Sequence, residues 1–158
     1  VLYTASEACP FKGPNDIVFD DQGGFYFTDL GKARPREMDR GGVYYARADG
    51  SFITELAHPM VTPNGIGLSP DGTVLYVAET ETARLWAFDL DGPGKIRRHP
   101  FPSPHGGRIV AGIGGYNRFD SLAVDADGNV CVATLVNGGI TVIEPDTGEW
   151  RHIPVPGE

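Results

Sequence analysis

The sequence predicts an all-β fold, a β-propeller of which the chain holds about three four-stranded blades. One pattern occurs three times: a small oxygen-bearing residue, a short apolar strand, an Asp/Gly turn and a second strand. Its copies begin at Asn15, Asn64 and Asp120, so they are 64 − 15 = 49 and 120 − 64 = 56 residues apart. Propeller blades repeat at roughly 40–50 residues. The 22 Gly and 13 Pro residues recur as turn punctuation between these strands, which favours many short strands.

The first repeat covers residues 13–59 and follows a break at Gly13-Pro14. Residues 31–41 are polar and interrupted by proline, so we expect a loop there. Ala48-Asp-Gly-Ser is typical of a hairpin turn. The opening run Val1-Leu-Tyr-Thr-Ala resembles a strand with no partner before it in the sequence. We expect the strands of this repeat at residues 17–19, 25–28, 42–47 and 52–56.

The second and third repeats, residues 62–102 and 118–155, have the same form, and a Pro/Gly-rich link, residues 100–115, joins them. Four short antiparallel strands per unit are typical of a propeller blade. The chain, residues 1–158, is therefore interpreted as a single partial propeller domain. A continuous β-sandwich is the alternative, but it would not require Asn or Asp at the start of every repeat. The expected strands are residues 66–68, 75–78, 84–88, 95–99, 122–124, 130–133, 140–143 and 150–153.

Three blades are too few to close a ring, because propellers typically contain roughly four to eight. We therefore expect the chain to be part of a longer protein, with assembly from copies of itself as the alternative. An open fan of blades exposes an apolar face at each end, and such faces drive association. Missing blades or self-association are thus the expected partners of these faces.

Composition excludes some classes of partner. The formal net charge of −8 argues against a nucleic-acid ligand, which needs a concentrated basic face. No apolar run is long enough to span a bilayer, so no membrane partner is expected. The two cysteines make no disulfide framework, and Cys131, between two valines, is expected to be a buried free thiol. No basic-then-apolar leader is visible, so the expected location is cytoplasmic, although the chain does not open with Met.

The three repeated polar residues are the candidate functional site. Asn15, Asn64 and Asp120 each immediately precede an innermost strand, so blade symmetry should bring them to one mouth of the central channel. Two amide oxygens and a carboxylate suit Ca²⁺ or Mg²⁺ better than Zn²⁺, which prefers nitrogen and sulfur. Taken singly, each would be an ordinary turn residue. Their shared register in all three repeats is what favours a metal or substrate site.

Three longer motifs carry a family resemblance: Gly13-Pro-Asn-Asp-Ile-Val-Phe-Asp, Pro63-Asn-Gly-Ile-Gly-Leu-Ser-Pro-Asp-Gly and Asp120-Ser-Leu-Ala-Val-Asp-Ala-Asp-Gly. Together they resemble the SMP-30/gluconolactonase/luciferin-regenerating-enzyme family, from about Gly13 to Gly148. The resemblance implies a six-bladed propeller with one divalent cation in its channel, acting as a lactone hydrolase. It further implies that Asn64 and Asp120 are metal ligands, that Asn15 binds substrate or water beside the metal, and that Asp120 is the general base.

The resemblance also implies a reaction mechanism, and the sequence departs from the family pattern at one position. The cation, with Ca²⁺ favoured over Mg²⁺, Mn²⁺ and Zn²⁺, would polarise the carbonyl of a lactone or related ester, while Asp120 deprotonates or only orients the attacking water. The family's remaining ligand is a Glu near its N-terminus, and Glu7 stands in no matching motif. The alternatives are a non-catalytic binding propeller, an inactive fragment, or an organophosphate-type hydrolase on the same fold.

Overall fold

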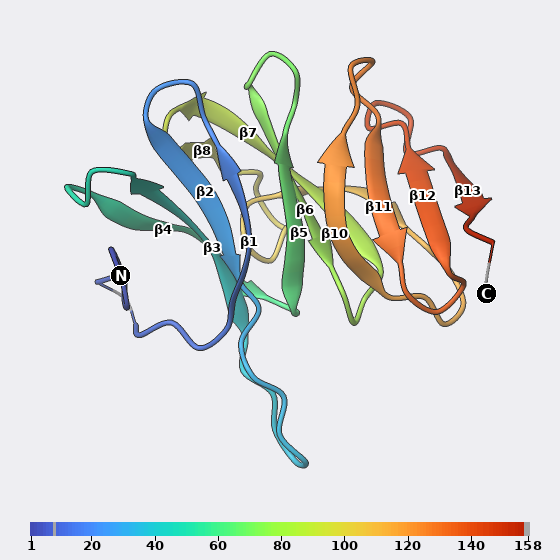
Figure 1. Cartoon of the computed structure of the whole chain (residues 1–158), viewed down its shortest axis with the longest axis horizontal. Coiled ribbons are helices and arrows are strands. Elements are labelled where there is room, and N and C mark those ends of the chain that lie inside the picture. Colours follow the sequence, from blue (N-terminus) through green and yellow to red (C-terminus); the bar gives the residue numbers. More distant parts are fainter. Residues whose placement is uncertain (8, 157–158) are drawn as a thin grey trace.

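The structure, a computed structural model, describes residues 1–7 and 9–156 as a fan of three antiparallel β-sheets (Figure 1). The described residues contain no helix, and the predicted all-β class is confirmed. No helix in this described part is long and apolar enough to span a membrane. Within each sheet, strands that follow one another in the chain lie side by side, as expected of propeller blades.

The first and third sheets are the predicted four-stranded blades. Ile17, Ile66 and Leu122 lie on the innermost strands of the three sheets, as predicted. The first sheet contains β1 (Pro14–Phe19), β2 (Gly24–Asp29), β3 (Gly41–Arg47) and β4 (Ile53–Met60) in that order. The third sheet contains β10 (Phe119–Val124), β11 (Val130–Thr134), β12 (Gly139–Ile143) and β13 (Trp150–Pro154) in that order.

The second sheet has five strands, one more than the sequence predicts. It contains β5 (Pro63–Leu68), β6 (Val74–Glu79), β7 (Arg84–Gly92) and β8 (Lys95–Arg97), and β9 (Arg108–Gly112) also pairs with β7. The stretch expected to be only a link therefore contains β9. The reason is the length of β7: the three-residue β8 pairs with its last part, and β9 pairs with its first part. An edge that would otherwise expose unpaired backbone groups is thus covered.

The N-terminal segment covers the open face of the first sheet and is not a strand. The expected strand-like run contributes only an isolated bridge between Ala5 and Pro10. Aromatic packing explains why: the Phe11 ring lies 5.2 Å from that of Phe27 and 5.1 Å from that of Tyr44. Side-chain packing on the sheet face, rather than pairing at its edge, thus places this segment.

The hydrophobic core lies between neighbouring sheets. One buried cluster joins the first and second sheets, and another joins the second and third. Trp86 belongs to the first cluster and therefore packs between two blades. Cys131 is free, as expected, but only half-buried. Representative members of the two clusters are Tyr26, Val43, Ile66, Val77 and Phe88, and Tyr76, Leu85, Phe119, Val130 and Val132.

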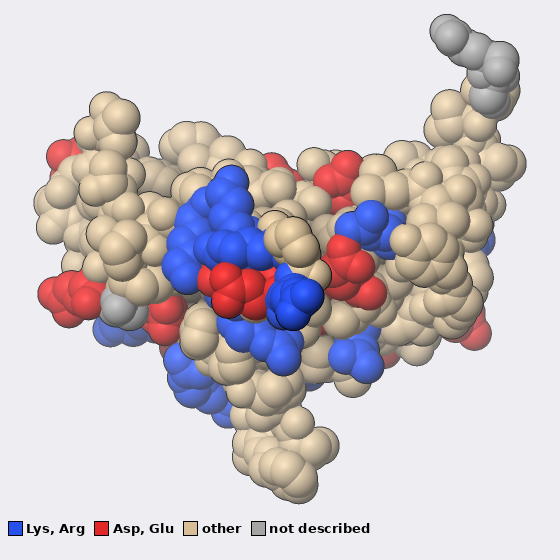
Figure 2. Space-filling model, turned by 90° about the horizontal axis from the view of Figure 1, so that it is seen from below, with Lys and Arg blue, Asp and Glu red and all other residues tan. Residues whose placement is uncertain are grey.

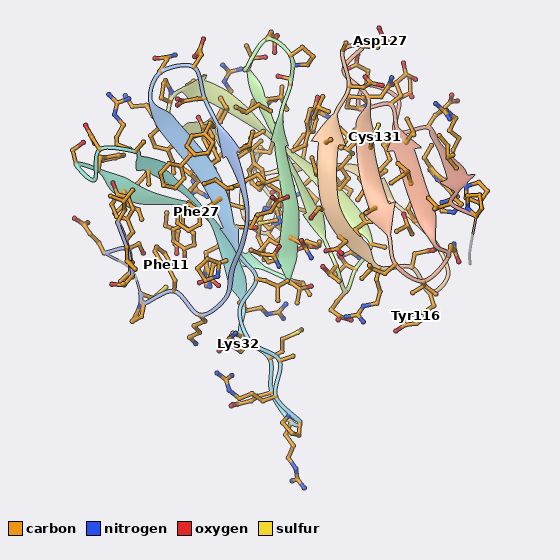
Figure 3. All side chains as sticks on the ribbon, in the orientation of Figure 1. Phe11, Phe27, Lys32, Tyr116, Asp127 and Cys131 are labelled. Atoms are coloured by element: carbon orange, nitrogen blue, oxygen red, sulfur yellow. The ribbon has the colours of Figure 1, made fainter. Side chains whose placement is uncertain are left out.

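The alternation of strand directions gives the fan two distinct edges. We call the edge where β1, β5 and β10 begin the site edge; it is the lower edge in Figure 1. The opposite edge, which we call the turn edge, carries the hairpin turns that end these strands. The loop between β2 and β3, residues 30–40, projects from the site edge, and Lys32 marks its base in Figure 3.

Candidate metal and catalytic site

Each innermost strand contains an irregularity in its pairing at the candidate residue. In every sheet the first residue of the innermost strand is paired with the neighbouring strand, and the next two residues are not. Those two residues stand opposite a single residue of the partner, which is the geometry of a β-bulge. Such bulges re-aim side chains and are common beside functional sites. Asn15, Asn64 and Asp120 each follow the first pair, so their structural equivalence is established. The flanking pairs are Pro14–Asp29 and Ile17–Phe27, Pro63–Glu79 and Ile66–Val77, and Phe119–Thr134 and Leu122–Val132.

Two of the three candidates touch across the boundary between the second and third sheets. The Nδ2 of Asn64 donates a hydrogen bond to Oδ1 of Asp120 at 2.8 Å and another to Oγ1 of Thr80 at 3.1 Å. Asn64 is 5% exposed, whereas Asp120 is half-buried and so accessible from solvent. The backbone carbonyl of Asn64 also accepts a hydrogen bond from the Thr28 hydroxyl at 2.7 Å. Residues from three sheets therefore fix the position of Asn64.

Gly65 allows the strands carrying these two residues to approach. A Cβ placed on Gly65 would lie 2.6 Å from the carbonyl oxygen of Asp120 and 2.6 Å from the backbone nitrogen of Leu122. Both atoms belong to backbone, so no side-chain rotation can make room. The absence of a side chain at this position is therefore a condition for the contact between Asn64 and Asp120.

Replacing Gly65 with Ala should force β5 and β10 apart. We expect a loss of about 1–3 kcal/mol in the free energy of unfolding, the usual scale for overpacking, and disruption of the Asn64–Asp120 contact. Urea unfolding of both forms measures the change. Gly114→Ala is the matched control, because its added Cβ would meet no atom within 4 Å and its backbone is not in the left-handed region. Equal stability of the two variants would contradict this account.

Asn15 occupies the equivalent position on β1 but faces a different environment. It is exposed and lines a cleft of about 290 Å³ together with Tyr3, Phe11 and Phe27. Among the described residues, no hydrogen bond joins its side chain to Asn64 or Asp120. Asp16 points toward the second sheet instead: its Oδ2 accepts a hydrogen bond from the Ile66 backbone N–H at 3.2 Å.

A pair of buried carboxylates, which the sequence analysis did not assign, anchors the segments that enter β1 and β5. Asp29 ends β2 and accepts hydrogen bonds from the backbone N–H groups of Lys12 at 2.8 Å, Gly13 at 2.6 Å and Gly31 at 3.0 Å. Glu79 ends β6 and accepts one from the backbone N–H of Val61 at 2.6 Å. Both carboxylates therefore have a structural role. Asp29 is paired with Pro14, which precedes Asn15, and Glu79 is paired with Pro63, which precedes Asn64.

The chemistry of Asn64 and Asp120 fits a hard divalent cation. The Oδ1 of Asn64 is buried and has no hydrogen-bond partner in the described part of the chain. An amide oxygen without a donor, next to a half-buried carboxylate, makes a pair of oxygen ligands suited to Ca²⁺ or Mg²⁺. The described residues contain no group of three or more His, Cys, Asp and Glu side chains that could hold a metal. Calcium usually takes six to eight oxygen ligands, so these two residues would supply only part of a coordination shell.

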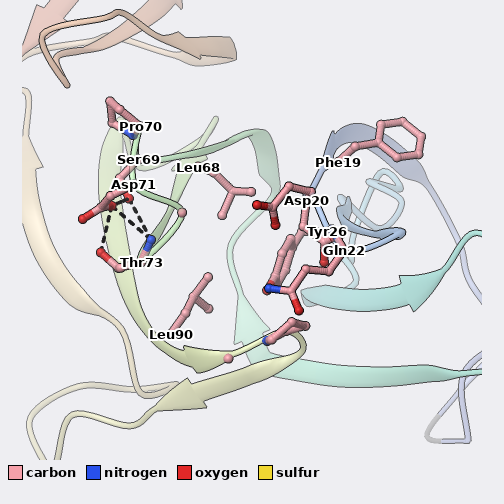
Figure 4. Close-up of a pocket in the computed structure, with 14 residues that line it drawn as sticks. Phe19, Asp20, Gln22, Tyr26, Leu68, Ser69, Pro70, Asp71, Thr73 and Leu90 are labelled. Carbon is pink, nitrogen blue, oxygen red and sulfur yellow. Dashed lines mark hydrogen bonds between the residues drawn. The ribbon is translucent and has the colours of Figure 1, made fainter.

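A larger cavity, of about 530 Å³, lies at the turn edge between the first and second sheets (Figure 4). Two of its carboxylates, Asp20 and Asp71, accept hydrogen bonds from nearby protein groups. Asp71 accepts hydrogen bonds from Ser69 and Thr73 of its own turn. Burial acts to raise the pKa of Asp20, but hydrogen bonds from Gly24, Gln22 and Tyr45 outweigh it, so this pKa is lowered. We therefore place the candidate site at the Asn64–Asp120 pair.

Comparisons with curated proteins point to lactonases. Lactonase drp35 of Staphylococcus epidermidis is 35% identical over 143 residues, which is 90% of this chain and 42% of that protein. Lactonase drp35 of Staphylococcus aureus (strain USA300) is likewise 35% identical over 143 residues, with the same coverage. The chain thus spans less than half the length of the curated relatives that it matches.

Solved structures with the same fold include a gluconolactonase and a calcium-binding protein. A gluconolactonase from Xanthomonas campestris superposes with a TM-score of 0.74 at 26% identity, over 98% of this chain and 51% of that one. The calcium-binding protein regucalcin from Agrobacterium tumefaciens gives a TM-score of 0.73 at 25% identity, over 91% of this chain and 46% of that one. These coverages agree with three blades of the family's six. The family described as SMP-30/Gluconolactonase/LRE-like region matches residues 1–158, and the chain belongs to this family.

Proposed function

We propose that the protein hydrolyses a lactone or related ester at the site built on Asn64 and Asp120. The contact between these two side chains, at equivalent bulges in neighbouring blades, is the observation that carries the proposal. Relatives described as lactonases support the reaction class. The chemistry is addition of water to the carbonyl carbon and cleavage of its bond to the ring oxygen. One proton of the water ends on the ring oxygen, which becomes a hydroxyl group, and the other is released to solvent when the new carboxyl group ionises, so the product is a hydroxy acid anion.

Asn64 and Asp120 are proposed to hold a divalent cation. Ca²⁺ is favoured because the residues offer hard oxygen ligands and because a solved relative is described as a calcium-binding protein. Mg²⁺, Mn²⁺ and Zn²⁺ are the alternatives. When bound, such a cation supplies Lewis-acid polarisation of the substrate carbonyl and stabilises the charge that develops on its oxygen.

Asp120 is proposed to act on the attacking water. Its carboxylate is half-buried and held by the amide of Asn64, so it can accept a proton or a hydrogen bond from a water molecule in a defined direction. Asn15 is proposed to bind substrate, because its exposed amide is available to sugar-like hydroxyl groups. Asn64 keeps the carboxylate oriented, and the buried Thr80 hydroxyl keeps Asn64 oriented in turn.

Metal removal tests this proposal. In the protein at its natural length, a chelator should abolish lactone hydrolysis, and added Ca²⁺ should restore it, because two protein ligands alone cannot replace the cation's charge. The measurement is the initial rate of gluconolactone opening before chelation, after it, and after titration with each of the four cations. Hydrolysis that persists in excess chelator would contradict the metal site.

A binding module is the competing function on this fold. The structure of a nidogen/laminin complex shares the fold, with a TM-score of 0.67 at 16% identity. The fold by itself therefore does not choose between an enzyme and a binding protein. The same assay separates the two, since a binding module would open no lactone under any metal condition.

A further inference from the structure

Charge is divided between the two edges of the fan. The hairpin turns of the turn edge contain many carboxylates and no Lys or Arg of their own, and two guanidinium groups from adjoining strands, Arg47 and Arg108, donate to carbonyls of these turns. A chain with a net charge of −8 therefore presents much of its negative charge on the side away from the candidate site. The carboxylates of these turns are Asp20, Asp21, Asp49, Asp71, Asp125, Asp127, Glu144, Asp146 and Glu149.

The site edge carries an excess of cations on one projecting loop. We call residues 30–40, between β2 and β3, the basic arm. Seen from below, Lys and Arg side chains gather on this face around a few acidic ones (Figure 2). The arm contains four cations and two carboxylates: Lys32, Arg34, Arg36 and Arg40, and Glu37 and Asp39.

The basic arm is a hairpin held by backbone hydrogen bonds and ion pairs. The backbone N–H of Asp39 donates to the Lys32 carbonyl at 3.0 Å, and that of Arg34 donates to the Glu37 carbonyl at 2.8 Å. The Asp39 carboxylate accepts from Nζ of Lys12 at 2.7 Å and from the Arg34 guanidinium at 3.1 Å. These partners hold the pKa of Asp39 at about 2, so the carboxylate stays charged at any ordinary assay pH.

The base of the arm adjoins the candidate site. A Cβ placed on Gly41, directly after the arm, would lie 2.4 Å from Cδ of Pro63, which immediately precedes Asn64. Three cations of the arm remain uncompensated: Lys32, Arg36 and Arg40 are exposed and form no ion pair within the described residues. Fixed positive charge beside a site raises the local concentration and the association rate of anions.

We propose that the basic arm makes the site selective for anionic substrates, namely lactones that carry a phosphate or carboxylate group beside the ring. This inference rests on the lactone hydrolysis proposed above. A large acidic partner is a poorer fit, because the strongly negative turn edge and the net charge of −8 would repel it. A small anion feels mainly the nearest charges, since those beyond a Debye length of about 10 Å are screened.

A pair of charge-matched variants tests the inference in the protein at its natural length. Lys32→Gln with Arg40→Gln removes the two unpaired cations at the base of the arm. Lys95→Gln with Arg151→Gln removes two from the exposed outer strands β8 and β13, where neither forms an ion pair within the described residues. Each double variant changes the charge of this chain from −8 to −8 − 2 = −10. The substrates are gluconolactone and gluconolactone phosphorylated on its exocyclic hydroxyl.

The arm variant should lower kcat/KM for the phosphorylated lactone about three- to tenfold at low salt, and leave that for the neutral lactone unchanged. High salt should remove the difference. The control variant should leave the ratio of the two kcat/KM values as in the unaltered protein. Hydrolysis of both lactones with an unchanged ratio in the arm variant would overturn this inference alone. If the unaltered protein opens neither lactone, the proposed function fails as well.

Discussion

Asp120→Asn should lower lactone turnover by about two or more orders of magnitude, the scale of losing a general base. The substitution keeps the size of the side chain and one oxygen that can accept from Asn64, but it removes the negative charge. It should also weaken cation binding. Asn15, Asn64 and Asp120 are equivalent by register, and Asp120 is the one among them that supplies a full negative charge. The measurements are kcat with gluconolactone and a calcium titration by calorimetry.

Asn15→Ala is the comparison for that variant. Asn15 is equivalent by register, yet within the described residues no hydrogen bond joins its side chain to Asn64 or Asp120. It should therefore impair substrate turnover while leaving more of the calcium affinity intact. Normal hydrolysis by Asp120→Asn would show that the carboxylate has no catalytic role, even if the calcium titration still placed a cation there.

Asp29→Ala should destabilise the protein by about 3–5 kcal/mol. Asp29 is 5% exposed, and its carboxylate accepts three backbone hydrogen bonds. A buried N–H left without an acceptor costs roughly 1–3 kcal/mol. The N–H of Gly31 is buried and those of Lys12 and Gly13 are partly buried, so the three losses do not add in full. Urea unfolding measures the change. Because the freed groups lie at the entry to β1, Asn15 should lose its fixed position too.

Asp49→Ala provides the matched control for Asp29. Asp49 is exposed in the turn between β3 and β4, and its carboxylate accepts hydrogen bonds only from Ser51 within the described residues. Its removal should change the free energy of unfolding by no more than about 0.5–1 kcal/mol. Comparable losses for the two variants would show that the Asp29 anchor contributes little.

The innermost strands and the register of the site could be predicted because their signals are local. Each Asp/Gly turn follows a short apolar strand, so the position of Asn64 and Asp120 relative to their strands is written in a few adjacent residues. Equivalence between blades then implies proximity, and the 2.8 Å contact confirms that these two meet. The anchoring carboxylates had a signal of the same kind, since Asp29 and Glu79 both end the second strand of a repeat.

The features that escaped prediction depend on distant parts of the chain. Residues 108–112 form β9 because the first part of β7 offers a free edge, and nothing in their own Pro/Gly-rich surroundings indicates it. The surroundings of Asn15 depend on what packs against the first sheet, where Phe11 and Tyr3 lie. The closeness of Gly65 to the backbone of Asp120 is likewise a property of two sheets and not of either motif.

Because Asn64 and Asp120 lie on different sheets, the cation binding proposed above would be coupled to the docking of the second sheet on the third. A cation held by both residues would bind when the second and third sheets are docked and not when they are apart. By thermodynamic linkage it would therefore stabilise the docked arrangement of the two sheets. At a free concentration one hundred times its Kd, it would add about 2.7 kcal/mol to the docked state. Each sheet is a contiguous stretch of chain with its own hairpins. Withdrawal of the cation should thus loosen this junction before any single sheet unravels, and amide hydrogen exchange along β5 and β10 would record it first.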